Sequence, residues 1–122
     1  MNAKHYVSLE AAKKLKELGY NERVSGMIDD SNYLHEDVYR TNDELEIDMH
    51  SCPSLLEAMD WLEERGISVN VYLLASFRQK GFTYCIAFAD VKDNIYSNDN
   101  NEFFPDKYSA YHAAIIKALE LL

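Results

Sequence analysis

Residues 67–91 read ISVNVYLLASFRQKGFTYCIAFADV, and this stretch decides the fold class. Apolar side chains recur at every second position of 67–77 and again of 82–91, which is the side-chain period of a β-strand. The four residues between the two runs, Arg78 to Gly81, include a glycine and are typical of a short hairpin loop. The stretch therefore predicts an antiparallel hairpin with strands at about 67–77 and 82–91.

The two faces of this predicted hairpin differ in polarity. The loop position places Phe77 opposite Phe82. The same register places Leu73 opposite Ile86, and this face is apolar throughout. The reverse face carries fewer polar residues than a half-exposed antiparallel sheet usually has, so we expect it to be covered by another part of the chain or by a second copy in a homo-oligomer. The candidate oligomer contacts on this face are Tyr72, Leu74, Cys85 and Ala87.

Three further segments have the pattern of an amphipathic helix that begins at a capping serine. A serine hydroxyl at this position accepts a hydrogen bond from a free N–H group of the first turn, and apolar residues then recur with the spacing of one helix face. In the second segment Glu57 forms a capping box with Ser54, and Gly66 suits the left-handed residue that ends a helix. The predicted helices, at about 9–18, 55–65 and 110–121, follow Ser8, Ser54 and Ser109.

The remaining secondary structure is predicted from shorter signals. Residues 24–28 and 44–49 are typical of short strands, and residues 95–96 add a last one. The strands follow one another without the regular β-α-β alternation of a parallel sheet. The expected fold is therefore α+β, with a small antiparallel sheet and three helices largely on one of its faces. With 122 residues, the chain is expected to form a single domain, 1–122.

The strongest signal beyond the fold is a local concentration of negative charge. Residues 29–48 contain eight acidic residues against the single Arg40, a net charge of −7, whereas the whole chain carries −9. Such a segment either keeps the protein soluble as an acidic, partly mobile surface or docks a basic protein partner. Aromatic residues interleaved with the acids would give such a contact an apolar anchor. The candidate partner-binding residues are Asp29, Asp30, Tyr33, Glu36, Asp37, Tyr39, Asp43, Glu44, Glu46 and Asp48.

Several classes of ligand and partner are not expected for this chain. Its four glycines, at 19, 26, 66 and 81, form neither the Gly-x-Gly-x-x-Gly pattern nor the Walker pattern of phosphate-binding loops. Its negative net charge is a poor match to the negatively charged backbone of nucleic acid. No apolar run approaches the roughly 20 residues that span a bilayer, and no signal-peptide core follows the first residues. We therefore expect a cytoplasmic protein without a cofactor, a nucleic-acid partner or a membrane partner.

The alternative is a small enzyme or a ligand- or metal-binding domain. His35, His50 and Cys52 could meet in one pocket, although neither 35–37 nor 50–52 has the spacing of a zinc-ligand pair. Cys52 lies near the start of the second predicted helix, whose dipole would lower the pKa of its thiol. No glycine-rich elbow or loop flanks this cysteine, and the simpler interpretation is that both cysteines of the chain are buried, reduced thiols.

The order of helix caps and apolar core positions along the chain is a further pattern, carried by residues 7–12, 16–20, 53–62 and 108–114. This pattern resembles a group of small proteins of unknown function from gut bacteria and from their phages and mobile elements. The resemblance covers most of the chain and implies a fold and a genomic setting. The resemblance implies no catalytic residues.

These observations favour a non-enzymatic accessory or protein-interaction protein. Segment 29–48 is its expected docking site for a basic partner. The pocket near His35, His50 and Cys52 is the expected site if the chain is instead an enzyme or a ligand-binding domain.

Overall fold

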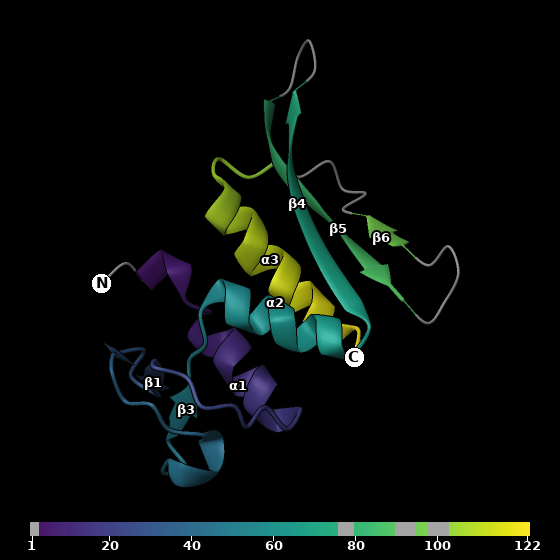
Figure 1. Cartoon of the computed structure of the whole chain (residues 1–122). Helices are drawn as coiled ribbons and strands as arrows, with labels where there is room; N and C mark the ends of the chain where they lie inside the picture. The colour runs from purple at the N-terminus through teal and green to yellow at the C-terminus, as the bar shows by residue number, and fades with distance from the viewer. Residues whose placement is uncertain (1–2, 76–79, 90–94, 98–102) are drawn as a thin grey trace. The chain divides into compact units, whose positions relative to one another are not determined.

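The computed structural model describes residues 3–75, 80–89, 95–97 and 103–122, with the backbone alone at 74, 75, 80 and 95–97. Its fold is α+β, with antiparallel strands and three α-helices, as the sequence predicts (Figure 1). Contacts within the chain divide it into two compact units, residues 1–58 and residues 59–122. The strands form two sheets, one in each unit, where the sequence led us to expect one.

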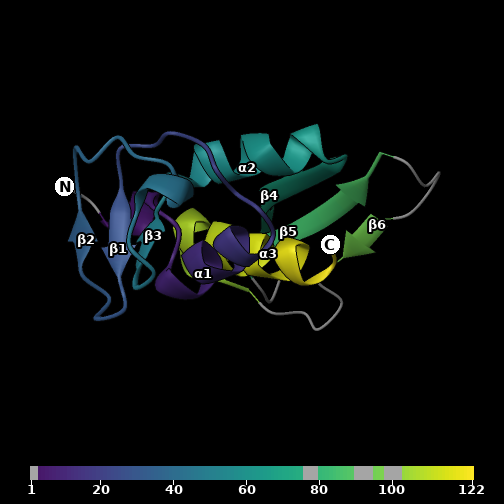
Figure 2. The same cartoon turned by 90° about the horizontal axis from the view of Figure 1, so that it is seen from below.

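The first unit is a helix packed on a small three-stranded sheet. Its elements are η1 (Ala3–His5), α1 (Leu9–Glu17), β1 (Met27–Asp29), β2 (Leu34–His35), η2 (Asn42–Glu44) and β3 (Met49–Ser51), where η marks a single 3₁₀ turn. The sheet has the order β2-β1-β3, and Figure 2 shows these strands side by side. α1 contacts β1 and β3, and its buried residues are Ala11, Ala12 and Leu15.

The second unit is a long hairpin packed on a helix. Its elements are β4 (Ile67–Ala75), β5 (Lys80–Phe88), β6 (Ile95–Ser97) and α3 (Lys107–Glu120). The boundary between the units falls inside helix α2 (Leu55–Glu64). The strands have the order β4-β5-β6, and α3 contacts both strands of the β4–β5 hairpin. The predicted strand at 95–96 is thus confirmed as β6.

Two of the three predicted helix caps are confirmed, and one is wrong. The Ser8 hydroxyl accepts from the Ala11 N–H at 3.2 Å, and Ser54 and Glu57 form the expected reciprocal bonds at 2.9 and 3.1 Å. α3 instead begins after Asp106, whose carboxylate accepts from the Ser109 N–H at 2.9 Å. An aspartate is as good an N-cap as a serine, so the helix starts three residues before the predicted position.

The predicted register of the hairpin is wrong by four residues, although the two faces keep their composition. Ala75 pairs with Lys80 and Leu73 pairs with Phe82, so Phe77 does not lie opposite Phe82. Gly81 belongs to β5 and not to the loop. A Cβ at this position would lie 2.9 Å from the Cβ of Phe103. The glycine therefore marks a close approach of two segments, which is a frequent reason for glycine in a strand.

The short strands of the first unit differ from their predictions. Residues 44–48 form the end of η2 and a turn, and the strand begins only at Met49. The predicted strand 24–28 overlaps β1, which runs one residue further, while Val24 forms an isolated bridge with Arg40. β2 was not predicted at all. Its two residues are too few to show an alternating pattern.

Candidate functional site

The acidic segment 29–48 is a folded part of the first unit rather than a loose connection. It contains the end of β1, all of β2 and η2, and the turn before β3. Three of its residues, Asn32, Asp37 and Tyr39, have left-handed backbone angles, with φ of 66°, 59° and 53°. Asparagine and aspartate tolerate this conformation, whereas tyrosine adopts it less readily. The carbonyl of Tyr39 accepts from Arg23 Nη1 at 2.7 Å, which helps to fix this turn.

Asp29 organises the β1–β2 turn. Its Oδ1 accepts from the backbone N–H groups of Ser31 at 2.9 Å and of Tyr33 at 3.1 Å, and its Oδ2 lies 3.2 Å from His35 Nε2. The hydrogen bond from the Tyr33 N–H is the main cause that lowers the pKa of the Asp29 carboxyl from its usual value, and the hydrogen bond to His35 is the second. The ring of Tyr33 packs edge-on against His35, with centroids 4.8 Å apart. Asp29 therefore shapes its own turn and is not a free surface charge.

Asp30 connects the turn to β3 and to α1. Its Oδ1 lies 2.7 Å from Nε2 of His50 and 3.6 Å from Nζ of Lys13. The bond to His50 is the main cause that lowers the pKa of Asp30. On the other side of the imidazole, Lys16 Nζ lies 3.5 Å from Nδ1 of His50 and donates to the Met49 carbonyl at 2.8 Å. Because an ammonium can only donate, this contact favours the tautomer in which Nε2 carries the proton and donates it to Asp30.

The two histidines of the site lie on opposite faces of the first sheet. His35 is opposite Met27 and His50 is opposite Ile28 in the strand register. Neighbouring residues of one strand point to opposite faces, and cross-strand partners share a face. The chain thus forms two separate Asp–His pairs, one on each face, and does not bring His35 and His50 together.

The second half of the segment is held by η2. Glu44 bonds to Arg23 at 2.8 Å and accepts from both the backbone N–H and the hydroxyl of Thr41 at 3.1 Å. The Thr41 N–H is the main cause that lowers the pKa of Glu44. Asp43 accepts from the Asn21 side chain at 2.9 Å. The buried Asn42 donates to the Tyr20 carbonyl at 2.7 Å and accepts from the Ser51 N–H at 2.9 Å, which fastens η2 to the core.

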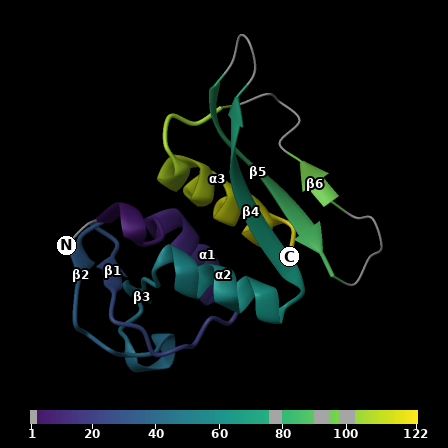
Figure 3. The same cartoon turned by 45° about the horizontal axis from the view of Figure 1, so that its top comes forward.

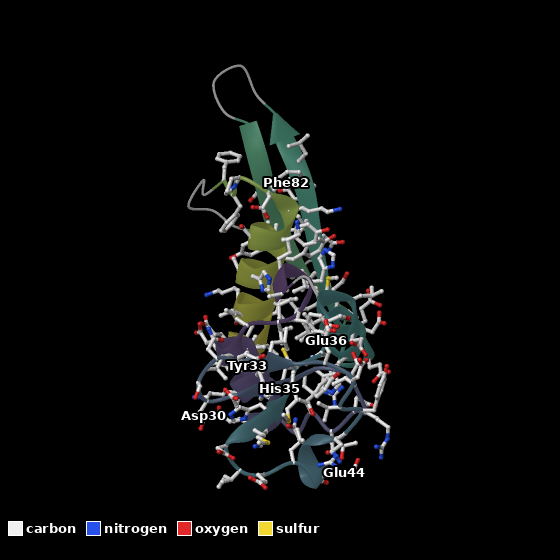
Figure 4. All side chains as sticks on the ribbon, turned by 90° about the vertical axis from the view of Figure 1, so that its left-hand side faces the viewer. Asp30, Tyr33, His35, Glu36, Glu44 and Phe82 are labelled. Carbon is white, nitrogen blue, oxygen red and sulfur yellow. The ribbon has the colours of Figure 1, made fainter. Side chains whose placement is uncertain are left out.

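The other acidic residues of the segment extend into solvent. Glu36, Glu46 and Asp48 are exposed, and no side-chain hydrogen bond or ion pair reaches them from the described ranges of the chain. Asp37 accepts a single long bond of 3.4 Å from the Tyr39 hydroxyl. Three apolar or aromatic side chains of the same segment are also exposed: Tyr33 by 64%, Tyr39 by 56% and Ile47 by 92%. Figure 4 shows Tyr33 and His35 next to each other, with Glu36 and Glu44 apart from them.

The residues of the alternative pocket occupy different environments. His50 is buried and His35 is half-buried. Burial raises the pKa of the Cys52 thiol to about 12, and its Sγ donates to the Val7 carbonyl at 3.2 Å. The predicted lowering of this pKa is therefore wrong, because desolvation opposes the thiolate more strongly than a helix end favours it. Within the described residues, no three His, Cys, Asp or Glu side chains are close enough to hold one metal ion.

The reverse face of the hairpin is described only in part. Tyr72 is 45% exposed, and Cys85 and Ala87 are half-buried. The side chain of Leu74 lies outside the described residues. Its role as an oligomer contact stays a prediction.

A small pocket lies in the second unit, at the junction of α2 with the hairpin. Its volume is about 210 Å³, which is below the usual range of roughly 300–1,000 Å³ for small-molecule sites. Glu63 is its one titratable lining residue among those described. The lining residues are Glu63, Gly66, Ile67, Ser68, Ala87, Phe88 and Ala89.

Comparison with protein-family models, with curated proteins and with solved structures finds no match to this chain. The resemblance to small proteins of gut bacteria and their phages therefore stays a prediction. In the part of the chain that the structure describes, no helix is both long and apolar enough to span a membrane.

Proposed function

We propose that this protein is a non-catalytic interaction protein and that segment 29–48 docks a basic protein partner. The observation that carries the proposal is the contrast between two groups of three acidic residues in this segment. Hydrogen bonds from the Tyr33 N–H, from His50 and from the Thr41 N–H lower the pKa values of Asp29, Asp30 and Glu44, and the same bonds hold the fold of the segment. Glu36, Glu46 and Asp48 project from the same folded segment without a side-chain partner among the described residues.

The nearby basic side chains do not neutralise this second group. Lys13 lies 3.6 Å from Asp30, and Arg23 lies 2.8 Å from Glu44. Lys16 donates to backbone carbonyls at Ile47 and Met49, at 3.2 and 2.8 Å. These cations fasten the segment to α1 and to the turn after it. The free carboxylates remain available for the cations of another molecule.

The structure of the segment also reduces the cost of binding. A charge on an ordered turn loses less conformational freedom when it meets a partner than a charge on a disordered chain. The exposed Tyr33, Tyr39 and Ile47 add apolar area beside the carboxylates, and tyrosine is frequent among residues that dominate binding energy. The expected partner therefore carries Lys or Arg residues around an apolar patch.

Binding of a fluorescently labelled lysine-rich peptide, followed by anisotropy at low ionic strength, tests the proposal. The variant Glu36→Gln/Glu46→Gln/Asp48→Asn should bind roughly tenfold more weakly than the wild type, since three exposed ion pairs contribute about 0.5 kcal/mol each. Added salt should weaken the binding of the wild type because these charges are solvent-exposed.

A matched control separates a docking surface from general acidity. The variant Asp60→Asn/Glu63→Gln/Glu64→Gln removes the same number of charges from exposed positions of α2. It should bind the peptide nearly as well as the wild type. Equal losses in the two variants, or no binding by the wild type, would show that the segment only adds solubility.

A further inference from the structure

Strand β4 lies at the outer edge of the second sheet. It has nine residues and pairs with β5 over its whole length. The other edge of β5 is occupied by β6 and by a bridge between Phe82 and Phe104. Figure 3 shows β4 and β6 on the two sides of β5. β4 is therefore an edge strand with one side unpaired by the described strands.

The backbone bonds of β5 establish which groups of β4 point outward. Phe82 and Phe104 exchange both of their backbone hydrogen bonds, at 3.0 and 2.8 Å, so the N–H and C=O of Phe82 point away from β4. Leu73 lies opposite Phe82. Two opposite residues of an antiparallel pair either exchange both backbone hydrogen bonds or exchange none, and the two kinds of pair alternate along the strands. Phe82 and Leu73 exchange none, so the N–H and C=O of Leu73 also point away from β5. The same alternation turns the backbone groups of Val69 and Val71 outward.

These outward groups have no partner in the described part of the chain. No hydrogen bond joins the N–H or C=O of Val69, Val71 or Leu73 to another described residue. Residues 67–75 also contain no charged residue and no proline, although proteins commonly use both to protect an exposed edge. Near the end of the strand, Tyr72 is 45% exposed and Leu73 is 55% exposed, so apolar surface accompanies the unpaired backbone groups. A nine-residue edge without protection is a template for another strand.

We propose that β4 pairs antiparallel with β4 of a second copy of this chain, around a two-fold axis at Val71. This register places Val71 opposite its own copy, Val69 opposite Leu73, and Asn70 opposite Tyr72. Apolar side chains thus meet apolar side chains on the face of Val69, Val71 and Leu73, and Asn70 meets Tyr72 on the other face. The strand carries no charged residue in a chain of net charge −9, so self-pairing places no like charges opposite each other in the paired strands, and a basic strand would find no opposite charge here.

The resulting dimer joins two hairpins into one continuous sheet. It uses the edge of the sheet, whereas the contacts predicted from the sequence lie on its reverse face. It is also independent of the docking surface, because segment 29–48 belongs to the first unit. Either proposal can fail while the other holds.

Light scattering on the full-length chain gives the first test, with a pair of variants at one position. The wild type should be a dimer. Leu73→Pro removes the outward N–H and should give a folded monomer, since proline is tolerated at the open side of an edge strand. Leu73→Ala keeps the N–H and should remain largely dimeric. A monomeric wild type, or a folded Leu73→Pro variant that stays dimeric, would overturn the proposal.

Cross-linking tests the register and does not depend on the fold of the proline variant. In a Cys85→Ala background, Val71→Cys should form a disulfide-linked dimer under mild oxidation. Opposite residues of a bonded antiparallel pair have Cα atoms about 5.5 Å apart, which a disulfide can span. Asn70→Cys in the same background should cross-link poorly, because its copy is displaced along the strand. Equal cross-linking at both positions, or none at Val71→Cys, would contradict the two-fold axis at Val71.

Discussion

Asp30 joins three parts of the first unit through one carboxylate. The side chain is half-exposed, yet its Oδ1 lies 2.7 Å from the Nε2 of buried His50. The imidazole is itself placed by its contact with Lys16 of α1 at 3.5 Å. The sequence reveals the acids but not this network, because the partners are 20 and 34 residues apart along the chain. The pairing of β1 with β3 and the packing of α1 on β3 bring them together.

The lowered pKa of Asp30 predicts how stability depends on pH. A carboxyl whose pKa is lower in the folded state stabilises the fold above its unfolded value of 3.8. This contribution is lost as the pH falls through the lower, folded value. Asp30→Asn should therefore reduce the urea midpoint at neutral pH and flatten its decline below about pH 4.

Asp48→Asn provides the control for this pH profile, because Asp48 is exposed and has no side-chain partner among the described residues. Its profile should match that of the wild type. If Asp30→Asn shows the full acid-induced decline of the wild type, the bond to His50 does not contribute to stability.

The start of α3 shows what a local pattern can predict. Asp106 and Ser109 are both good capping residues three positions apart, so the sequence alone allows a helix start at either. The structure uses Asp106, and Ser109 donates its hydroxyl to the Asp106 carboxylate at 3.1 Å. At Ser54 the sequence leaves no such choice, because Glu57 completes the capping box, and that prediction is confirmed.

Substitution at these two positions checks which residue caps α3. Asp106→Ala should lower the free energy of unfolding by about 1 kcal/mol, since it removes the acceptor for the Ser109 N–H. Ser109→Ala keeps that N–H and should cost less. Urea unfolding followed by circular dichroism measures both values. A larger loss in Ser109→Ala would place the cap at the serine.

At the scale of elements, alternation predicted the hairpin and its faces but not its register. The period of two residues is a property of each strand alone, whereas the register depends on where the loop lies. The sequence alone predicts Gly81 in the loop, because glycine is common in turns. Its actual environment is a close contact with Phe103, a residue distant in sequence, and no local pattern reports such a contact.

Gly81→Ala tests this interpretation of the glycine. The added methyl group would meet Phe103 Cβ at 2.9 Å and the Phe104 carbonyl at 3.2 Å. We expect a loss of about 1–3 kcal/mol in the free energy of unfolding, as is usual for an overpacked site. The double variant Gly81→Ala/Phe103→Gly should recover part of the loss, because it removes the Cβ that the added methyl group would meet. An unchanged stability for Gly81→Ala would mean that β5 and Phe103 are not in close contact.

At the scale of the whole molecule, the negative charge belongs to one folded segment. The sequence shows the concentration of acidic residues at 29–48, and it suggests a partly mobile surface. The structure shows strands, a 3₁₀ turn and a network of bonds in the same segment. The sequence could not separate the acids that hold the fold from those that are free, because the difference depends on Arg23, Lys13 and His50, which lie outside the segment.

The thermal midpoints of two variants test this separation most directly, since each variant removes three negative charges from segment 29–48. Asp29→Asn/Asp30→Asn/Glu44→Gln breaks the bonds that hold the segment, and its midpoint should fall by several degrees. Glu36→Gln/Glu46→Gln/Asp48→Asn removes only free charges, and its midpoint should stay the same or rise as repulsion decreases. Equal falls in the two midpoints, or a fall confined to the second variant, would contradict the division of the segment into structural and free acids.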